Sequence, residues 1–346
     1  MHPVRKPPAP HPASRVVLGV DGGSSKTHAA LVDETGQLLG FGSGGVANPN
    51  SFGLARGLKQ VAAAVHMALQ AAHLRPQQVE LGCFCLAGAD LPEDFPAIQA
   101  ALEDLHLARR VVLKNDTAAG LRSGLTRSWG VVVICGTGFN AAGRGRDGRE
   151  ISLPSLGPLT GDWGGGGTLG VEAVGAVMRA WDGRGRPTRL TRLVLDALHF
   201  PGEEELLSAL YHGRLSQQKI VRLTPLLFEA AQAGDEVSRE LVIRMGTEVG
   251  LTANVFLRRL DLAQSDAEVV LAGSVFKASG SLLLDTVDRV VHAVSPRARI
   301  VRPRIEPVAG ATLLALELAG LPVDTQTVSR MAAGPLALSP GSPDPR

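Results

Sequence analysis

Residues 15–42 read RVVLGVDGGSSKTHAALVDETGQLLGFG and predict a strand, a glycine turn, a second strand, a tight turn and a third strand. The first apolar run has strand length and stops at the turn DGGSS, residues 21–25. Its two glycines allow positive φ and close backbone approach, and the hydroxyl groups of the turn and of Thr27 add donors, so the turn can surround a phosphate. A carboxylate that faces a phosphate is repelled unless a divalent cation lies between them. Asp21 is therefore expected to hold Mg²⁺.

Lys26-Thr27 invites comparison with the P-loop, G-x-x-x-x-G-K-[ST], but the glycine positions of that motif fall on Val20 and Ser25. A P-loop also opens a helix, whereas residues 28–32 (HAALV) continue as a strand. A phosphate-binding β-hairpin therefore fits better. An ordinary Gly-Ser hairpin turn is the alternative that this stretch alone leaves open.

The elements after the hairpins alternate between helix and strand. They are, in order, a helix over 54–73, a strand over 79–87, a helix over 95–105, a strand over 111–113 and a helix over 117–125. Hairpins pair strands antiparallel, whereas crossovers through helices require parallel pairs. A mixed sheet is expected.

The same order then restarts, which indicates an internal duplication. The second half contains a strand over 131–135, the turn Gly136-Thr137-Gly138, strands over 140–145 and 150–153, a helical stretch from 169 to about 260, a strand over 268–271, the turn Ala272-Gly273-Ser274, a strand over 299–301 and a closing helix over 309–319. We expect a duplicated α/β fold whose two domains, 15–127 and 128–325, enclose a cleft. Residues 1–14 and 326–346 are expected to be disordered tails.

Composition excludes several classes of protein. Of the 346 residues, 45% are hydrophobic and 20% are charged, as in an ordinary globular protein with material for two cores. The net charge of +2 is small and aromatic residues make up 4%, so nucleic acid is not an expected partner. No apolar segment approaches the ~20 residues that span a bilayer, so no membrane association is expected and the cytoplasm is the expected location.

Cys83, Cys85 and Cys135 lie inside apolar runs without C-x-x-C spacing. Buried, reduced structural cysteines are the expectation, and a metal or cluster site is the alternative.

Two glycine turns at equivalent places in duplicated domains indicate nucleotide binding, in the layout of the actin and hexokinase superfamily with its ribonuclease-H-like domains. Within it, the chain resembles the BadF/BadG/BcrA/BcrD-type ATPase and N-acetylglucosamine kinase family over nearly all of residues 15–320. The matching stretches are GVDGGSSKT, GSGGVANPN, LAGAD, NDTAAG, CGTGFN, GPLTGDWG and LAGSVFK. The resemblance implies an ATP-dependent kinase that phosphorylates a hydroxyl of an amino sugar, with Mg²⁺ as cofactor. A homodimer is one expected assembly, and the sequence leaves the oligomeric state open.

By this resemblance, three turns hold the nucleotide, with Asp21 on the Mg²⁺ side. The expected ATP-binding residues are Gly22, Gly23, Ser24, Ser25, Lys26, Thr27, Gly136, Thr137, Gly138, Gly273, Ser274 and Lys277. Because phosphoryl transfer needs little covalent help from the protein, positioning and charge neutralisation by these turns should carry most of the rate.

A sugar hydroxyl is a poor nucleophile until its proton is accepted, so a kinase of this class needs a carboxylate. Asp116 is the expected base, because it follows the strand VVLKN and precedes a helix, where open α/β sheets bind ligands. N-capping of that helix is the alternative role. The other expected substrate-binding residues are Asn48, Gly88, Asp90, Phe139, Asn140, Gly157 and Asp162. Turn chemistry is the alternative for Asn48, and helix initiation is the alternative for Asp162.

The sequence departs from the N-acetylglucosamine kinases that it resembles at the sugar end. Their Gly-Thr-Gly-Ser-Asn becomes GTGFN at 136–140, their Gly-Trp-Gly becomes SLG at 155–157, and their Gly-Asp-Glu-Gly becomes GDWG at 161–164. The nucleotide machinery is therefore better supported than the sugar. Glucosamine, another amino sugar or N-acetylmuramic acid stays open beside N-acetylglucosamine, as does the hydroxyl that is phosphorylated.

Two other functions use the same fold. An ATPase that activates 2-hydroxyacyl-CoA dehydratases would need exposed cysteine ligands for an iron–sulfur cluster between subunits, whereas Cys83 and Cys85 lie on a strand expected to be buried. The other is a non-catalytic sensor of sugar and nucleotide. Regulators related to sugar kinases usually append a helix-turn-helix, for which residues 1–14 are too short and too rich in proline.

Overall fold

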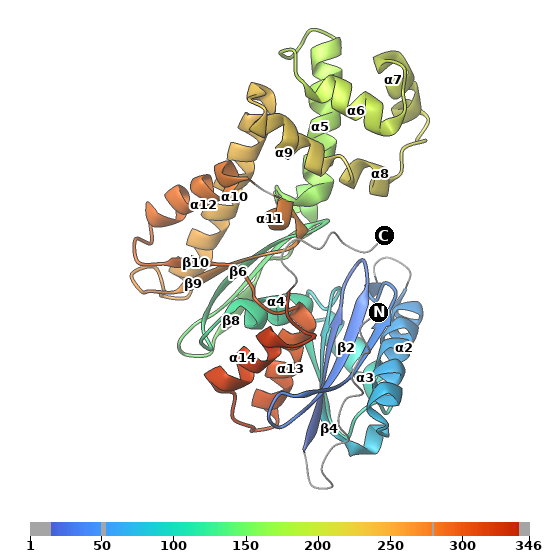
Figure 1. Cartoon of the computed structure of the whole chain (residues 1–346), viewed down its shortest axis with the longest axis vertical. Helices are drawn as coiled ribbons and strands as arrows, with labels where there is room; N and C mark the ends of the chain where they lie inside the picture. Colours follow the sequence, from blue (N-terminus) through green and yellow to red (C-terminus); the bar gives the residue numbers. More distant parts are fainter. Residues whose placement is uncertain (1–14, 50–52, 279, 339–346) are drawn as a thin grey trace. The chain divides into compact units, whose positions relative to one another are not determined.

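The computed structural model describes residues 15–49, 53–278 and 280–338 (Figure 1). These residues form two compact units, each built around a five-stranded mixed sheet. Among the described residues, the first unit combines those up to Ser128 with those from Arg302 to Leu338, and the second unit runs from Trp129 to Val301. The duplicated α/β fold predicted from the sequence is confirmed.

The sheet of the first unit has the strand order β3-β2-β1-β4-β5. Its strands are β1 (Val16–Gly22), β2 (Thr27–Asp33), β3 (Leu38–Gly44), β4 (Val79–Leu86) and β5 (Val111–Asn115). Two hairpins pair β1, β2 and β3 antiparallel, whereas β1, β4 and β5 are parallel. The carboxyl ends of β1, β4 and β5 therefore meet at one edge of the sheet, where open α/β sheets bind ligands.

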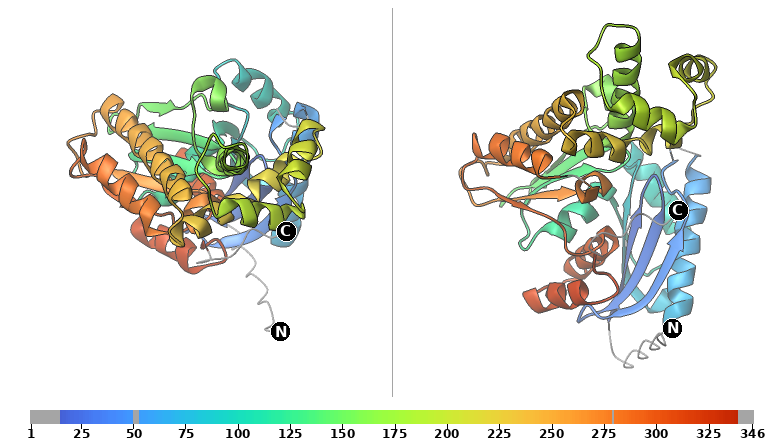
Figure 2. Two further views of the ribbon diagram at one scale, coloured as in Figure 1. Left: turned by 90° about the horizontal axis from the view of Figure 1, so that it is seen from above. Right: turned by 45° about the horizontal axis from the view of Figure 1, so that its top comes forward.

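Helices cover both faces of this sheet. They are α2 (Leu54–Ala72), α3 (Asp94–Glu103), α4 (Asp116–Gly124), α13 (Pro307–Leu318) and α14 (Thr325–Ala333), with a 3-10 helix η1 (Pro76–Gln78) before β4. Side chains of β1 alternate between the two cores: Val16 and Val20 pack with α2, whereas Val17 packs with α13. In Figure 2, α2 lies along the blue strands on one side and the red helices lie on the other.

Gly19 permits the close approach of α13 to β1. A Cβ at this position would lie 2.3 Å from the backbone N of Thr312, so any other residue would push the helix away. Asp21 is two residues further along β1 and therefore shares the face of Gly19. The register of the strand thus directs Asp21 toward the layer formed by α4 and α13.

The sheet of the second unit repeats this order as β10-β9-β6-β7-β8. Its strands are β6 (Gly130–Cys135), β7 (Phe139–Arg144), β8 (Glu150–Ser152), β9 (Glu268–Ala272) and β10 (Arg299–Val301). The hairpins of β6, β7 and β8 are antiparallel, and β6, β9 and β10 are parallel. The turn between β6 and β7 is therefore equivalent to the turn between β1 and β2, as the duplication predicts.

The second unit also contains a large helical part. Its helices are α5 (Gly165–Trp181), α6 (Leu190–Leu198), α7 (Glu203–Tyr211), α8 (Gln217–Val221), α9 (Thr224–Gln232), α10 (Glu236–Arg259), α11 (Ser274–Ala278) and α12 (Ser281–His292). Helices α5 to α10 lie between β8 and β9 in the chain and correspond to the helical stretch expected from 169 to about 260. Within the ranges that the structure describes, no helix is long and apolar enough to cross a bilayer.

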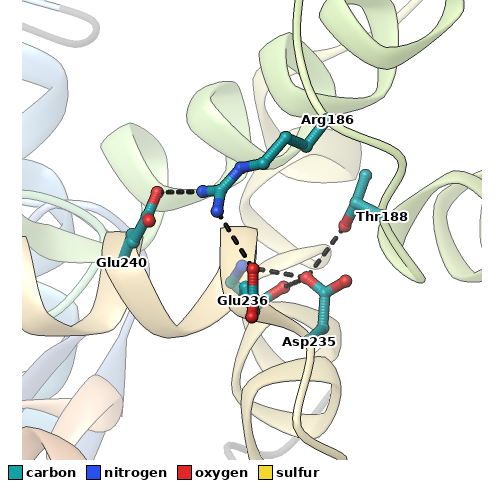
Figure 3. A network of polar contacts seen from close by, with 6 residues as sticks. Arg186, Thr188, Asp235, Glu236 and Glu240 are labelled. Carbon is teal, nitrogen blue, oxygen red and sulfur yellow. Dashed lines mark hydrogen bonds and ion pairs between the residues drawn. The ribbon is translucent and has the colours of Figure 1, made fainter.

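Asp235 joins two segments of this helical part (Figure 3). Its carboxylate caps α10 by accepting from Ser238 N at 2.9 Å, and it also accepts from Thr188 Oγ1 and Arg189 N, each at 2.9 Å. Burial disfavours the ionised form, but hydrogen bonds from these three residues outweigh burial and lower the pKa of Asp235. The start of α10 and the segment before α6 are thereby held together.

Two expectations about the end of the chain are wrong. The tail expected over 326–346 contains α14, on which Thr327 and Met331 are buried, and a Cβ at Gly36 would lie 2.7 Å from Thr327. The expected second domain, 128–325, ends at Val301, because α13 packs on β1 and β4 of the first unit. Residues 1–14 and 339–346, also expected to be disordered, lie outside the described residues.

Candidate active site

The turn between β1 and β2 is held by backbone contacts. Gly23 N donates to Lys26 O at 2.9 Å, and Gly23 O accepts from Ala47 N at 3.1 Å. Gly22 permits close packing, because a Cβ there would lie 2.5 Å from Leu86 Cδ2. Both glycines lie outside the left-handed region. The expectation that they supply positive φ is therefore wrong, and close approach is the reason for Gly22.

Of the three hydroxyl groups expected to bind phosphate, one serves the fold instead. Thr27 is buried, and its hydroxyl donates to Gly45 O at 2.6 Å. The hydroxyl proton of Thr27 is thus engaged within the fold, and ATP binding by this residue stays a prediction. Ser24 and Ser25 are exposed at the tip of the turn, where their hydroxyl groups are accessible.

The loop after β3 carries Asn48 to this turn. Asn48 Nδ2 donates to Ser24 Oγ at 2.9 Å. Gly88, at φ +86°, makes room for the loop, since a Cβ there would lie 2.6 Å from Pro49 Cδ and 2.9 Å from Asn48 Oδ1. Gly88 therefore accommodates Asn48 and Pro49, and sugar binding by Asn48 stays a prediction.

Asp21 is half-buried at the end of β1, beside other acidic groups. Burial and the charge of Asp116 raise the pKa of Asp21 to about 7; Lys26 opposes this effect and Glu306 adds to it. A divalent cation would relieve the repulsion, so these carboxylates fit Mg²⁺ electrostatically. Among the described residues, however, no group of three or more His, Cys, Asp or Glu side chains is arranged to enclose a metal ion. A bound Mg²⁺ would need phosphate oxygens or water as further ligands.

Asn115, not Asp116, caps α4. Asn115 Oδ1 accepts from Thr117 N at 3.0 Å and also from the hydroxyl of that residue. Asp116 is the first residue of the helix and is half-buried. Burial, followed by the charge of Asp90, raises the pKa of Asp116 to about 6, against backbone hydrogen bonds from Thr117 and from Asp116 itself. Asp116 is thus largely ionised at neutral pH and more basic than an ordinary aspartate.

The same asparagine fixes Asp90. Asn115 Nδ2 donates to Asp90 Oδ1 at 2.7 Å and to Ala89 O at 3.1 Å. Burial raises the pKa of Asp90, assisted by Asp94 and opposed by the hydrogen bonds from Asn115 and the backbone of Gly88. The sequence selected Asp21, Asp90 and Asp116 separately. Asp116 links them, because it interacts electrostatically with both Asp21 and Asp90 at one edge of the sheet.

Glu306 belongs to this group but was not found from the sequence. It occupies the N-cap position of α13, is half-buried, and its charge contributes to the raised pKa of Asp21. Pro307 signals a helix start at this position. No pattern in the sequence shows that this late helix begins beside the end of β1.

The second glycine turn, between β6 and β7, rests on the start of α5. The backbone amides of residues 166 and 167 donate to Gly136 O at 2.7 Å and to Thr137 O at 2.8 Å. Gly165, at φ +76°, permits this approach, since a Cβ there would lie 2.3 Å from Gly138 O. In contrast, a Cβ at Gly136 or Gly138 would meet no atom within 4 Å. The turn therefore borders open space, as a phosphate cradle requires.

The third glycine turn lies beside the second. Gly273 has φ +104°, and a Cβ there would lie 2.3 Å from Cys135 O at the end of β6. Ser274 begins the short helix α11, and Ser274 and Lys277 are both exposed. The structure thus brings the expected ATP-binding residues of this unit to the same end of its sheet, since β6 and β9 are parallel.

Asp162 closes a compact turn before α5. Its Oδ2 accepts from Gly157 N at 3.0 Å and from Thr160 Oγ1 at 2.7 Å, around the 3-10 helix η2 (Gly157–Thr160). The side chain is largely buried. Helix α5 begins only at Gly165, with Gly164 at its N-cap, so helix initiation does not explain Asp162.

Phe139 packs inside the second unit. It is buried, and a Cβ at Gly164 would lie 2.6 Å from its ring. The ring is therefore part of the core, and substrate binding at residue 139 stays a prediction. Asn140 directs its side-chain oxygen to Ala141 N at 2.7 Å, and its contact with the sugar stays a prediction.

The three cysteines are free and fully buried, as expected. Cys83 and Cys85 lie side by side in the core beneath α13, with their sulfur atoms 3.9 Å apart. Burial raises the pKa of the Cys135 thiol well above its usual range. Thiols in these positions are not available to ligate a cluster at a subunit surface.

Comparisons with known proteins agree with this arrangement. The model of the BadF/BadG/BcrA/BcrD ATPase family matches residues 18–315. An N-acetyl-D-glucosamine kinase from Dictyostelium discoideum is 30% identical over 88% of this chain and 98% of that protein, and an N-acetylmuramic acid/N-acetylglucosamine kinase from Clostridium acetobutylicum is 26% identical over 87% and 98%. The crystal structure of a candidate N-acetylglucosamine kinase from Chromobacterium violaceum has a TM-score of 0.66 and 25% identity, covering 88% of this chain and 100% of that one. The chain therefore belongs to the BadF/BadG/BcrA/BcrD ATPase family.

Proposed function

We propose that this protein is an ATP-dependent kinase that transfers the γ-phosphate of ATP to a hydroxyl of an amino sugar of the N-acetylglucosamine type. Membership of the ATPase family supports the use of ATP, and the relatives named as kinases of N-acetylglucosamine and N-acetylmuramic acid support the acceptor class. The equivalent glycine turns of the two duplicated sheets support nucleotide binding.

The observation that carries the proposal is the environment of Asp116. Asn115 performs the capping of α4, so capping is not the reason for an acid at position 116. The raised pKa of Asp116, about 6, suits a group that must be ionised at neutral pH and still take a proton. A carboxylate in this state is what a sugar hydroxyl requires to become a nucleophile.

In the proposed reaction, Asp116 accepts the proton of the sugar hydroxyl while the hydroxyl oxygen bonds to the γ-phosphorus. The bond from the γ-phosphorus to the bridging oxygen breaks, and ADP leaves with the electron pair. Asn48, Asp90 and Asp162 are proposed to bind other hydroxyl groups of the sugar. Gly23, Ser24, Ser25, Lys26 and the turn at 136–138 are proposed to hold the phosphates, and residues 273, 274 and 277 the adenosine.

Mg²⁺ is the proposed cofactor, held by Asp21 through water. When bound, it neutralises phosphate charge. The negative charge around Asp21 supports this role. Asp116 and Glu306 both raise the pKa of Asp21, and Lys26 offsets them only in part.

The burial of Phe139 bears on the identity of the sugar. Its ring packs against Gly164, which supports the proposal that this departure from the N-acetylglucosamine kinases acts on core packing. The other two departures from the N-acetylglucosamine kinases, at residues 155–157 and at Trp163, lie close to Asp162 in the sequence. N-acetylglucosamine is accordingly the first acceptor to test.

A cytoplasmic location and a homodimer are also proposed. The reduced state of the three buried cysteines supports the location. Ile243, Leu251 and Val255 are exposed on one face of α10 and support a self-association surface. Light scattering in solution would test the dimer.

A panel of amino sugars and hexoses, incubated with ATP and Mg²⁺ and scored for ADP release, tests the proposed function. We expect N-acetylglucosamine or a related amino sugar to stimulate ADP formation. If ATP binds but no sugar raises ADP release above background, the proposal fails. An anaerobic visible spectrum should lack cluster absorbance, because the buried cysteines give no support to a dehydratase-activating ATPase.

A further inference from the structure

We infer that Trp163, Glu172 and Arg244 form a positioning network that fixes the Asp162 turn relative to the glycine turn at 136–138. The inference rests on the proposed function, in which Asp162 contacts the sugar and the glycine turn contacts the phosphates. Every residue involved belongs to the second unit. The network would therefore set where the sugar is held relative to the group that it receives.

The Asp162 turn is shaped by bonds within itself. Asp162 Oδ2 accepts from Gly157 N and Thr160 Oγ1, and Asp162 N donates back to Gly157 O at 3.1 Å. Gly161 N donates to Pro158 O at 3.2 Å. These contacts define the conformation of residues 157–162, but they do not fix the turn to the rest of the unit. Leu159, in the middle of it, is 91% exposed.

Trp163, the next residue, connects the turn to two helices. Its Nε1 donates to Glu172 Oε1 at 3.1 Å on α5. The guanidinium carbon of Arg244, on α10, lies 4.2 Å from the centre of the indole, and Arg244 Nη1 is 3.9 Å from Glu172 Oε1. The indole is thus held at its edge by a carboxylate and on its face by a cation. Trp163 is also one of the places where the sequence departs from N-acetylglucosamine kinases.

Helix α5 supports both turns. Its second and third residues, 166 and 167, donate to Gly136 O and Thr137 O, and Glu172 lies about one and a half turns further along the same helix. A rigid helix therefore holds the glycine turn at its start and Trp163 at Glu172. Loss of this support would let the Asp162 turn move away from the sugar and weaken the contact proposed for Asp162.

The test compares Arg244→Ala with Arg146→Ala. Arg146 is a matched control, since its guanidinium carbon lies 4.4 Å from the centre of the Trp129 ring and it also pairs with a carboxylate, Asp266, at 3.9 Å. Both arginines are exposed, so each variant should fold, and equal melting temperatures would establish this. Arg244→Lys keeps a cation that can lie over the indole and should recover most of the wild-type behaviour.

We expect Arg244→Ala to raise KM for the amino sugar about three- to tenfold, the range that an exposed cation–π contact and ion pair support, with KM for ATP unchanged. Calorimetric titration with N-acetylglucosamine should show the same loss of affinity. If Arg244→Ala leaves the sugar KM and affinity at wild-type values, or if Arg146→Ala raises them equally, the inference is overturned. A wild-type protein with no sugar-dependent turnover and no sugar binding would instead overturn the proposed function and this inference with it.

Discussion

Replacement of Asp116 by asparagine is expected to stabilise the unliganded protein while it removes turnover. Burial and the charge of Asp90 raise the pKa of Asp116 from 3.8 to about 6. Because a tenfold change in proton affinity corresponds to about 1.4 kcal/mol, keeping this carboxylate ionised costs the folded protein up to about 3 kcal/mol. Asparagine has nearly the same shape and does not ionise, so the variant avoids this cost.

The gain in stability should depend on pH with a definite sign. The unfolded chain releases the Asp116 proton near its ordinary pKa of 3.8, whereas the folded chain releases it near 6. The wild type therefore loses stability relative to the variant as the pH rises between these values. The difference in the free energy of unfolding should be small below pH 4 and constant above about pH 7. Urea unfolding at pH 4, 5 and 8 measures it, with Asp104→Asn, at an exposed position in the same unit, as the control.

The turnover of Asp116→Asn should fall, in contrast to its stability. A positioned general base contributes roughly 10²- to 10⁴-fold, about 3 to 5 kcal/mol of barrier, so kcat of Asp116→Asn should fall by that order while ATP affinity is retained. For the wild type, kcat/KM should rise with pH through about 6 as Asp116 ionises. An active variant would remove Asp116 from the mechanism and make Asp162 the next carboxylate to test. A variant that loses both activity and stability would show that Asp116 supports the fold.

Three further predictions concern stability and thiol chemistry. Asp235→Ala should lower the free energy of unfolding by about 1–2 kcal/mol through loss of the α10 cap. Because the pKa of Asp235 is lowered in the folded protein, the difference between wild type and variant should shrink as the pH falls below the ordinary pKa of an aspartate. Urea unfolding at pH 7 and pH 3 measures this difference, and an equal or larger difference at pH 3 would refute the prediction. Gly19→Ala should destabilise the protein by about 1–3 kcal/mol or more, because its Cβ would lie 2.3 Å from Thr312 N. Gly175→Ala in α5 should instead stabilise it by about 0.5–1 kcal/mol, because a Cβ there meets no atom within 4 Å. Equal melting temperatures for the two variants would refute the packing of α13 on β1. The three buried cysteines should react with a thiol reagent only after unfolding, and prompt reaction of the native protein would contradict their burial.

The local features of the fold could be predicted from the sequence. Apolar runs that stop at glycine turns predicted the first strands of each sheet, and the repetition of that pattern from residue 131 indicated the duplication. Asp116 followed from its place between a strand and a helix. The neighbouring asparagine as the helix cap was not foreseen, because both residue types favour that position and only the structure distinguishes them.

Features that depend on contacts between distant segments could not be predicted. Helix α14 is only nine residues long, and its fit against Gly36 appears only when the chain is folded. The same holds for α13, which crosses back to the first unit, and for Glu306, which it carries to Asp21. The burial of Phe139 could not be predicted either, since its neighbours in the sequence line an open turn while its own ring enters the core.

Phosphorus NMR of a complete reaction would distinguish sugar phosphorylation from simple ATP hydrolysis. The protein is incubated with ATP, Mg²⁺ and N-acetylglucosamine, with a parallel sample that lacks the sugar. We predict a phosphomonoester signal that grows in step with ADP and couples to a sugar proton, and little change in the sample without sugar. Inorganic phosphate as the product in both samples, or no conversion of ATP with any amino sugar, would contradict the assignment of this protein as an amino sugar kinase.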